Sequence, residues 1–211
     1  MEHFSKLIIG SWDRFYRGNF INSLSGFKSA SLIGTVSNNG LPNLAIFSNI
    51  VHIGADPALI GFVNRPREAA PHTLANIENA GQYTINHIHS DIMEAAHQTS
   101  AKYPVEESEF ATTGLTPAYK PGCLAPFVAE SRIQYGMELI EIIPITHNNT
   151  FFVIGEVQDV YLSDNWVATD GFITIEKAGS ITSLGVDGYY TAERIARFEY
   201  AKPDKKVKKM N

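Results

Sequence analysis

The sequence predicts a mainly β protein, a β-barrel that carries short inserted helices. Short runs rich in β-branched residues recur along the 211 residues and are separated by turn dipeptides, with 16 glycines and 10 prolines in all. The chain is 44% hydrophobic and only 18% charged, which is the balance of a globular protein with a sizeable core. No internal repeat and no shift in composition marks a boundary. We therefore expect a single domain over residues 1–211.

The first strands follow a lead-in segment, residues 1–25, that mixes aromatic residues with arginines and has no clean period. We expect it to pack its aromatic side chains on the domain surface. Strands are predicted at 30–37 and 42–52, because Asn39-Gly40 between two such runs is a strong hairpin signal. A third strand at 58–63 follows the turn at 54–57, so the three should form a meander.

Helices and a long polar excursion are predicted in the middle of the chain. Residues 71–81 form a short helix, with Thr73 as a plausible N-cap and Gly81 as its C-terminal glycine. A strand at 82–87 and a short helix at 90–99 come next. Residues 100–126 are polar and rich in proline and glycine, apart from one helical turn at 107–112; such loops are often lids, partner contacts or binding loops.

The second half returns to strands, at 127–133, 136–145 and 150–161, and residues 147–149 between the last two form a hairpin turn. Thr191 is positioned to cap a helix that ends at Arg197. The last ten residues, 202–211, form a basic tail with five lysines and one aspartate. Terminal charge runs are usually solvated and frayed, although an anchor to an anionic surface is the alternative.

Several classes of function are disfavoured. Cys123 is the only cysteine, so neither a disulfide framework nor a cysteine metal cluster is expected. The chain shows no signal peptide and no apolar run of membrane-spanning length, which predicts a cytoplasmic protein that does not bind membranes. A net charge of −5 argues against nucleic acid. The glycine-rich dinucleotide motif, the P-loop and the serine-hydrolase elbow are all missing from the sequence.

Polar residues interrupt the apolar runs at two points. Ser48-Asn49 lies within the second run, and Asn64-Arg65 ends the third. The helix that starts near Thr73 follows shortly after. A guanidinium beside a helix N-terminus, with its free N–H groups and a hydroxyl, is a reasonable receptor for phosphate. Taken singly, Thr73 would be a cap and Arg65 a surface charge; together the group predicts a ligand site.

A metal site is the competing interpretation. His87 and His89 face the same way on a strand, and His97 follows on the next helix. However, no carboxylate completes a spacing such as H-E-x-x-H, and a lone histidine is more often structural. A metal-dependent enzyme that uses these three histidines stays open as an alternative.

The chain resembles the flavin reductase-like FMN-binding proteins, which fold as a split β-barrel. The resemblance runs over most of the chain, and its specificity lies in the order and spacing of motifs that are individually degenerate. These motifs are FKSASLIGT (27–35), NLAIFSN (43–49), DPALIGF (56–62), HTLANIENAGQYTIN (72–86), AHQTSAKYP (96–104) and ESEFATTGL (107–115). The resemblance implies FMN bound at the interface of a homodimer, with NADH or NADPH as the electron donor.

The resemblance also implies which residues bind the cofactor. Phe47, Ser48, Asn49 and Ile50 would run along the isoalloxazine ring, with backbone groups and the Asn49 amide at its pyrimidine end. The phosphate would be held by a second group, namely Asn64, Arg65, His72 and Thr73. Further polar contacts would come from Lys28, Ser29, Ser100 and Lys102.

This chain departs from the common family pattern at two places. Phe27-Lys28-Ser29 stands where many relatives have a Pro-Arg-Pro-like sequence, and Pro71-His72-Thr73 stands where they have Lys-Asp-Thr. Neutral or flexible donors thus replace a fixed cation near the phosphate. No catalytic residue is named, because flavin chemistry needs no acid–base pair from the protein; His52 and His97 are the nearby histidines to consider as proton donors.

Two functions within the flavin proteins follow as expectations. The first is an oxidoreductase of flavin reductase type, which transfers hydride from NAD(P)H to flavin, or through bound FMN to an acceptor. The second is a non-catalytic FMN-binding module that acts as an electron carrier or sensor. The final acceptor and the choice between NADH and NADPH cannot be read from the sequence.

Overall fold

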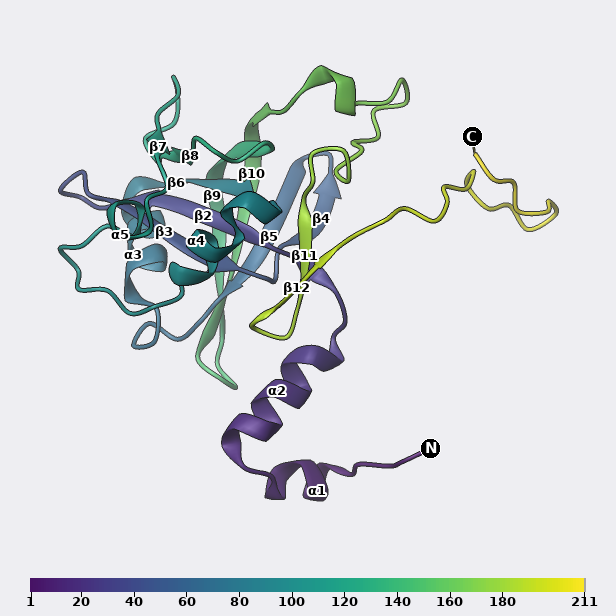
Figure 1. The fold of residues 1–211 in the computed structure, drawn as a ribbon, viewed down its shortest axis with the longest axis horizontal. Helices are drawn as coiled ribbons and strands as arrows, with labels where there is room; N and C mark the ends of the chain where they lie inside the picture. The colour runs from purple at the N-terminus through teal and green to yellow at the C-terminus, as the bar shows by residue number, and fades with distance from the viewer. Residues whose placement is uncertain (211) are drawn as a thin grey trace.

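A seven-stranded antiparallel sheet forms the body of the protein, in a computed structural model that describes residues 1–210 (Figure 1). Its strand order is β3-β2-β6-β9-β10-β5-β4. The strands are β2 (Ser31–Val36), β3 (Pro42–Phe47), β4 (Val51–Ala55), β5 (Ala58–Asn64), β6 (Gln82–His87), β9 (Gln134–Ile145) and β10 (Thr150–Tyr161). The predicted mainly β class with short inserted helices is confirmed.

Two small sheets and seven short helical segments complete the fold. One sheet joins β1 (Lys28–Ser29), β11 (Ile181–Leu184) and β12 (Gly188–Thr191); the other pairs β7 (Pro117–Ala118) with β8 (Phe127–Val128). The helical segments of the described chain are α1 (Lys6–Ser11), α2 (Arg14–Leu24), α3 (Pro71–Ala80), η1 (Ser90–Ile92), α4 (Met93–Gln98), α5 (Glu109–Thr113) and η2 (Asp164–Trp166).

The predicted meander is wrong, although its first hairpin is confirmed. β2 and β3 pair antiparallel, from Ser31 opposite Phe47 to Val36 opposite Pro42. The chain then leaves the sheet at residues 48–50, so the predicted strand 42–52 is two strands, and β4 pairs with β5 at the other edge. The polar pair Ser48-Asn49 therefore lies between two strands. The chain leaves the hydrogen-bonded ladder there and crosses to the opposite edge of the sheet.

The predicted helices around the excursion are confirmed, with one correction at a cap. Ala70 is the N-cap of α3 and Pro71 occupies its first turn, so Thr73 lies inside the helix and does not cap it. Proline is favoured at this position because its missing N–H would be unpaired in any case. Gly81 and Gly114 end α3 and α5 in the left-handed conformation, as helix C-termini favour.

The long hairpin β9–β10 is also confirmed, with Asn149 in its turn at a φ of 58°. Two predictions nearby are wrong. The strand predicted at 127–133 is limited to β8, residues 127–128. No helix forms at 191–197, because Thr191 pairs with Ile181 as the last residue of β12. A capping residue followed by a helix-compatible stretch is a local signal, and here long-range strand pairing overrides it.

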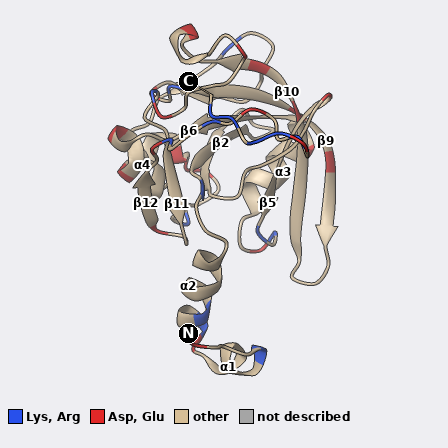
Figure 2. Ribbon diagram, turned by 90° about the vertical axis from the view of Figure 1, so that its right-hand side faces the viewer, with Lys and Arg blue, Asp and Glu red and all other residues tan. Residues whose placement is uncertain are grey.

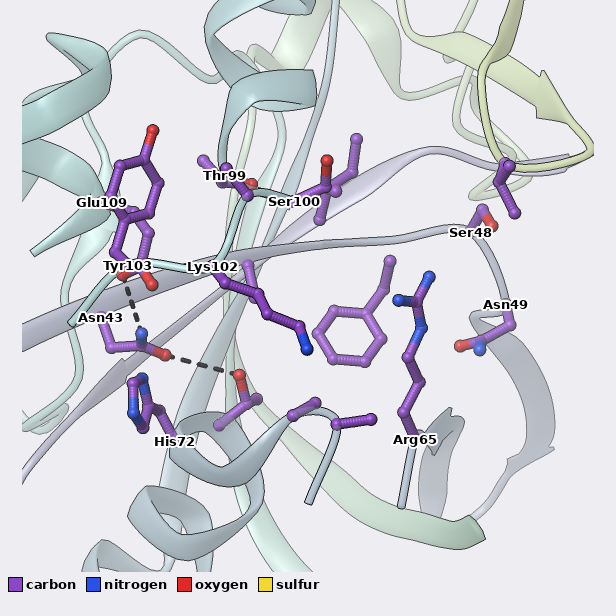
Figure 3. Close-up of a pocket in the computed structure, with 18 of the residues that line it drawn as sticks. Asn43, Ser48, Asn49, Arg65, His72, Thr99, Ser100, Lys102, Tyr103 and Glu109 are labelled. Carbon is purple, nitrogen blue, oxygen red and sulfur yellow. Dashed lines mark hydrogen bonds between the residues drawn. The ribbon is translucent and has the colours of Figure 1, made fainter. Parts of the chain in front are cut away.

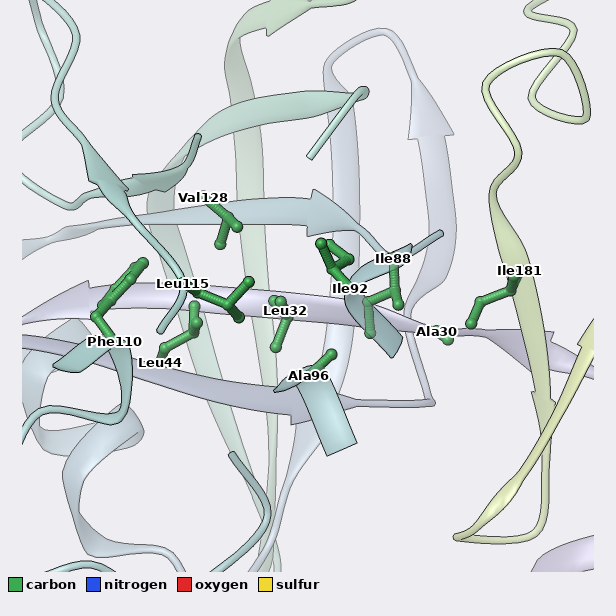
Figure 4. Packing of buried hydrophobic residues seen from close by; sticks show 10 residues of the cluster. All are labelled: Ala30, Leu32, Leu44, Ile88, Ile92, Ala96, Phe110, Leu115, Val128 and Ile181. Carbon is green, nitrogen blue, oxygen red and sulfur yellow. The ribbon is translucent and has the colours of Figure 1, made fainter. Parts of the chain in front are cut away.

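Two hydrophobic clusters hold the barrel together. One lies between β5, β6, β9 and α3 and includes Phe62, Leu74 and Tyr83. The other lies where α4 and α5 cover β2 and β3, and includes Leu32 and Phe110 (Figure 4). Each fully buried side chain of this size contributes about 1.5–3 kcal/mol. The second cluster fixes the excursion against the sheet, which positions one wall of the site described below.

The two ends of the chain lie outside this body. α1 and α2 stand clear of the barrel, and neither helix has a buried residue (Figures 1 and 2). The expectation that the lead-in segment packs on the domain surface is therefore wrong; its aromatic residues pack on one another, as Trp12 does with Phe20 at 5.0 Å between ring centroids.

The basic tail is exposed as expected, but it is not frayed. It folds back so that Phe198 and Lys209 form a β-bridge, and Lys208 pairs with Glu199. Asn211, the last residue of the predicted tail, lies outside the described residues. Within residues 1–210, no helix is both long and apolar enough to cross a membrane.

Candidate functional site

A cavity of about 350 Å³ opens at one end of the barrel. This volume lies within the range of small-molecule and cofactor sites. Its walls come from four parts of the chain that are distant in sequence: the end of β3 with residues 48–49, the segment from β5 to the start of α3, the excursion after α4, and the β11–β12 hairpin (Figure 3). The cavity therefore exists only when the whole barrel is folded.

Cations and free N–H groups gather on one side of the cavity. Arg65, which follows β5, and Lys102, from the excursion, extend into the same space from different walls (Figure 3). The first turn of α3, with His72 and Thr73, lines the cavity below them. The first backbone N–H groups of a helix have no partner within it, and the helix dipole favours negative charge there. This side of the cavity is suited to a phosphate.

A buried polar network forms the inner end of the cavity. The Asn43 side-chain amide donates to the Glu109 carboxylate at 2.7 Å, and the backbone N–H of Leu44 donates to the same oxygen at 3.0 Å. Asn43 also accepts from Thr35 at 3.1 Å and from Thr73 at 3.4 Å. Burial raises the pKa of Glu109, against the lowering effect of these donors. One residue, Asn43, thus connects β3 to both the excursion and α3.

Residues 48–49, where the chain leaves the sheet after β3, form another wall of the cavity, and the Asn49 side chain fixes this segment to β5. Its Nδ2 donates to the Val63 carbonyl at 2.8 Å, and its Oδ1 accepts from the Val63 N–H at 3.2 Å. Since Val51 pairs with Gly61, Asn49 lies opposite Val63, and its side chain extends the β4–β5 ladder. Phe47 beside it is fixed by an edge-on contact with Phe62, at 4.9 Å between ring centroids. This wall is rigid and largely apolar.

Eight of the twelve predicted site residues line this cavity. They are Phe47, Ser48, Asn49, Arg65, His72, Thr73, Ser100 and Lys102. The Asn49 amide, which we expected at the pyrimidine end of a flavin, bonds to the Val63 backbone instead.

The other four predicted residues, Lys28, Ser29, Ile50 and Asn64, lie outside the cavity lining. Lys28 donates to the Asn22 carbonyl and to Ser25 at the base of α2, and Ser29 belongs to β1, which pairs with β11. Ile50 packs against the barrel core, and Asn64 is fully buried, with its amide donating to the Arg65 carbonyl. Alternation along β5 explains Asn64, since Val63 faces the cavity and its neighbour faces the core.

The structure adds residues that the sequence reasoning missed. Asn43 and Glu109 are buried polar residues on β3 and α5, and only Asn43, which precedes the apolar run Leu44–Phe47, carried a local signal. The β11–β12 hairpin adds three more, namely Ser183, Val186 and Tyr189. No local pattern marked that hairpin, because its place at the cavity depends on the pairing of β11 with β1.

The three histidines of the metal alternative do not assemble. His87 bonds to Ser180, His89 to the Glu130 carbonyl, and His97 to the Tyr189 hydroxyl. Across residues 1–210, no group of three or more His, Cys, Asp or Glu side chains is arranged to hold a metal ion. Of the two histidines considered as proton donors, His52 is exposed on β4, whereas His97 contacts the cavity through Tyr189.

A family comparison agrees with this geometry. The model of the flavin reductase like domain matches residues 24–173, which is more than half of the chain and includes most of the cavity. The chain belongs to the flavin reductase-like domain family. The family includes oxidoreductases and implies the use of a flavin. The N-terminal helices α1 and most of α2, and the β11–β12 hairpin, lie beyond the matched residues.

Relatives of this flavin reductase-like chain support the assignment. A solved structure from Shewanella frigidimarina, a candidate flavin reductase with a split barrel domain, is 50% identical, with a TM-score of 0.91 over 95% of this chain and 100% of the other. An uncharacterised protein of Halalkalibacterium halodurans is 30% identical over 77% of this chain and 80% of its own length. Nitrilotriacetate monooxygenase component B of Bacillus cereus shares the fold, with a TM-score of 0.81 at 20% identity over 95% and 98% of the two chains. The predicted split-barrel fold is confirmed.

Proposed function

We propose that the cavity binds FMN and that the protein is an oxidoreductase which passes hydride from NADH or NADPH through this flavin. The observation that carries the proposal is the meeting of Arg65, Lys102 and the first turn of α3 on one side of a 350 Å³ cavity. FMN carries an anionic phosphate at one end and, at the other, a flat aromatic ring with a polar pyrimidine edge. The donor set and the apolar wall of this cavity fit these two ends.

The phosphate end is assigned to three groups. The guanidinium of Arg65 forms charge-assisted hydrogen bonds, which are about twice as strong as neutral ones. Lys102 adds a second cation from the opposite wall, and the backbone N–H groups of His72 and Thr73 add the helix N-terminus. The pair of cations compensates for the lysine that this chain lacks at the start of α3, where Pro71-His72-Thr73 stands.

The ring end is assigned to the wall formed by Phe47, Ser48 and Val63. The two hydrogen bonds between the Asn49 side chain and the Val63 backbone, which we call the Asn49 bridge, hold these residues, so the pocket is largely formed before a ligand enters. The same residues would exclude water from one side of the ring. When bound, FMN supplies a ring that takes up two electrons as a hydride and returns them to an acceptor. The residues of the chain orient the two reactants, which for this chemistry is the main requirement.

We further propose that the protein works as a homodimer. Val63 lines the cavity and belongs to a strand, β5, whose other outward-facing residues lie on an apolar surface next to the cavity. A second copy on that surface would close the open side of the cavity. This arrangement would also explain why the cavity of one chain is open to solvent.

An absorbance spectrum of the purified protein, before and after incubation with FMN and removal of excess, tests the cofactor. Bands of bound flavin are expected; a protein that stays colourless overturns the proposal. Oxidation of NADH and NADPH, followed at 340 nm with FMN and then with an added electron acceptor, tests the reaction. A protein that binds FMN but oxidises neither nucleotide is the electron carrier or sensor module, the second function expected from the sequence.

A further inference from the structure

The N-terminal arm, residues 1–27, is folded but largely uncovered, and it is tied to the body at its end, where Phe27 packs edge-on against Tyr190 at 4.9 Å between ring centroids. Asp13 caps α2 through hydrogen bonds from the N–H groups of Phe15 and Tyr16, and an aromatic cluster around Trp12 fixes α1 against α2. Nevertheless Leu7, Phe15 and Leu24 are 86%, 76% and 69% exposed. Contiguous exposed apolar side chains mark interaction sites in soluble proteins. An arm that is structured and apolar, yet uncovered, requires a surface to pack on.

The total surface supports the same conclusion. The chain exposes 13074 Å², whereas a compact monomer of 23.3 kDa exposes about 9,700 Å² by the usual scaling with mass. The excess of about 3,400 Å² per chain is larger than the roughly 1,000–2,500 Å² per partner that permanent homodimer interfaces bury, so enough surface is exposed for such a contact. The arm and the C-terminal segment extend from the barrel in Figure 1 and contribute to this excess.

A receiving surface of suitable chemistry lies on the outside of the barrel. Strands β4, β5, β10 and β9 are neighbours, and residues opposite one another in their ladders point to the same side. On the side away from the core, which we call the outer face, these strands carry Val51, Ile53, Val63, Ile143, Phe152 and Ile154. Strand positions that face solvent are normally polar. Those of the outer face are apolar, so this face, like the arm, is suited to contact another protein surface.

A glycine in β5 lets apolar side chains cover the centre of the outer face. Gly61 lies at its centre, and a Cβ there would come within 2.6 Å of the Phe152 ring and 3.0 Å of the Ile53 side chain. The absence of a side chain thus lets Phe152 and Ile53 lie over the strand. A continuous apolar surface of this kind can receive the apolar side of a helix.

The charges of the two surfaces are complementary. The arm carries Lys6, Arg14 and Arg17, against two acidic residues, Glu2 and Asp13. Acidic residues border the outer face, with Glu138 and Glu141 on β9 and Glu156 on β10, and no lysine or arginine lies on β4, β5, β9 or β10 (Figure 2). Opposite potentials of this kind select a partner surface and orient it.

We propose that the arm of one chain packs on the outer face of a second copy, and that the two copies exchange arms in this way. A twofold axis lets each chain give one arm and receive one, so both exposed surfaces of both chains are covered. The inference rests on the homodimer proposed above and adds the segment that joins the copies. This segment lies almost wholly before residue 24, where the family match begins.

Three single substitutions in the full-length chain test the exchange. Phe15→Glu places a charge on the arm, and Ile143→Glu places one on the outer face. Ile195→Glu, at a residue of the C-terminal segment that is 93% exposed, is the matched control. By sedimentation velocity, wild type and the control should have twice the mass of one chain. Each of the other variants should raise the dimer dissociation constant by tenfold or more, since a buried unpaired charge costs at least about 1.4 kcal/mol.

Mixing the two weakened variants gives the decisive result. In a mixed dimer the Ile143→Glu chain supplies an unaltered arm to the unaltered outer face of the Phe15→Glu chain, so one intact contact returns. The mixture should therefore dimerise more tightly than either variant alone, by threefold or more. No gain on mixing would overturn the exchange even if both variants dissociate, and so would variants as dimeric as wild type.

The homodimer itself is tested separately by the wild-type protein. A monomeric wild type overturns both the homodimer and the exchange. A wild type that is dimeric, with variants that stay dimeric, overturns the exchange alone. The flavin absorbance of each sample reports cofactor binding independently of mass, so loss of FMN would not be mistaken for loss of the arm contact.

Discussion

Asn43 and Glu109, 66 residues apart in the chain, are joined by a hydrogen bond of 2.7 Å at the inner end of the cavity. The bond ties the excursion, which carries Lys102, to the strand that precedes the Ser48-Asn49 wall. The same Asn43 side chain reaches Thr73 at the start of α3. The two walls that carry cations are thus held in register through one buried amide.

Two substitutions of Glu109 should separate its role as a hydrogen-bond acceptor from its role as a buried charge. Glu109→Ala leaves two buried donors, the Asn43 amide and the Leu44 N–H, without an acceptor, and should cost about 1–3 kcal/mol of stability. Glu109→Gln keeps an acceptor oxygen and should fold at least as stably as wild type at neutral pH. Urea unfolding of the three proteins measures the difference. Equal loss in both variants would show that the charge, and not the acceptor, matters.

The pH dependence of stability follows from the raised pKa of Glu109. A carboxyl group with a raised pKa binds its proton more tightly in the folded state than in the unfolded state. Its contribution is therefore full below the ordinary value of 4.5 and is lost as the pH rises through the folded pKa. Glu109→Gln has no such proton to lose, so its stability relative to wild type should increase from pH 4.5 to pH 8.

The Asn49 bridge should be sensitive to the loss of its donor. Asn49→Asp places a carboxylate oxygen against the Val63 carbonyl, where the amide now donates at 2.8 Å, and it should destabilise the protein more than Asn49→Ala does. The alanine variant should lose about 1–2 kcal/mol, since water can reach this partly buried site. Thermal unfolding ranks the two. If Asn49→Ala were the less stable of the two variants, the hydrogen bond from Asn49 to the Val63 carbonyl would not be what fixes this wall.

His87 should make the protein sensitive to acid. Burial lowers its pKa to about 4, against an ordinary value of 6.5. A histidine with a lowered pKa contributes stability above the unfolded value, and this contribution is lost as the pH falls from 6.5 to 4. The shift corresponds to about 3 kcal/mol. His87→Gln should lose less stability than wild type between pH 7.5 and pH 4.5 in urea unfolding, whereas His147→Gln, an exposed control, should follow wild type.

Much of the barrel was predictable because its signals are local. Gly40 and Asn149 lie in hairpin turns at positive φ, which these residue types tolerate, and Gly81 and Gly114 end helices for the same reason. The order of the strands in the sheet could not be predicted from local signals, because it depends on pairing between distant segments. β3 lies at one edge of the sheet and β4 at the other, although only residues 48–50 separate them in sequence, and only the assembled sheet determines that.

The residues of the candidate site show the same distinction between local signals, which could be predicted, and long-range contacts, which could not. Arg65 and Thr73 were identified because a cation and a helix start occur close together in sequence. Tyr189 reaches the cavity from the far end of the chain, through β11, and nothing around it in the sequence indicates a ligand. Asn64 was expected at the site from its neighbour Arg65, but the alternation of β5 turns it into the core.

The assignment of Arg65 and Lys102 to the phosphate gives a test that does not depend on turnover. Arg65→Gln and Lys102→Gln should each weaken FMN binding about tenfold, near the lower limit for hydrogen bonds to charged groups because both side chains are exposed. Neither should change the affinity for riboflavin, which has the same ring and no phosphate. Arg67→Gln is the matched control, since Arg67 pairs with Glu78 outside the cavity lining. Flavin fluorescence titrations measure the eight affinities at each of two salt concentrations, and higher salt should narrow the gap between wild type and the two variants for FMN alone. Equal losses for FMN and riboflavin would place these cations at the ring, and the phosphate would then have to be held by α3.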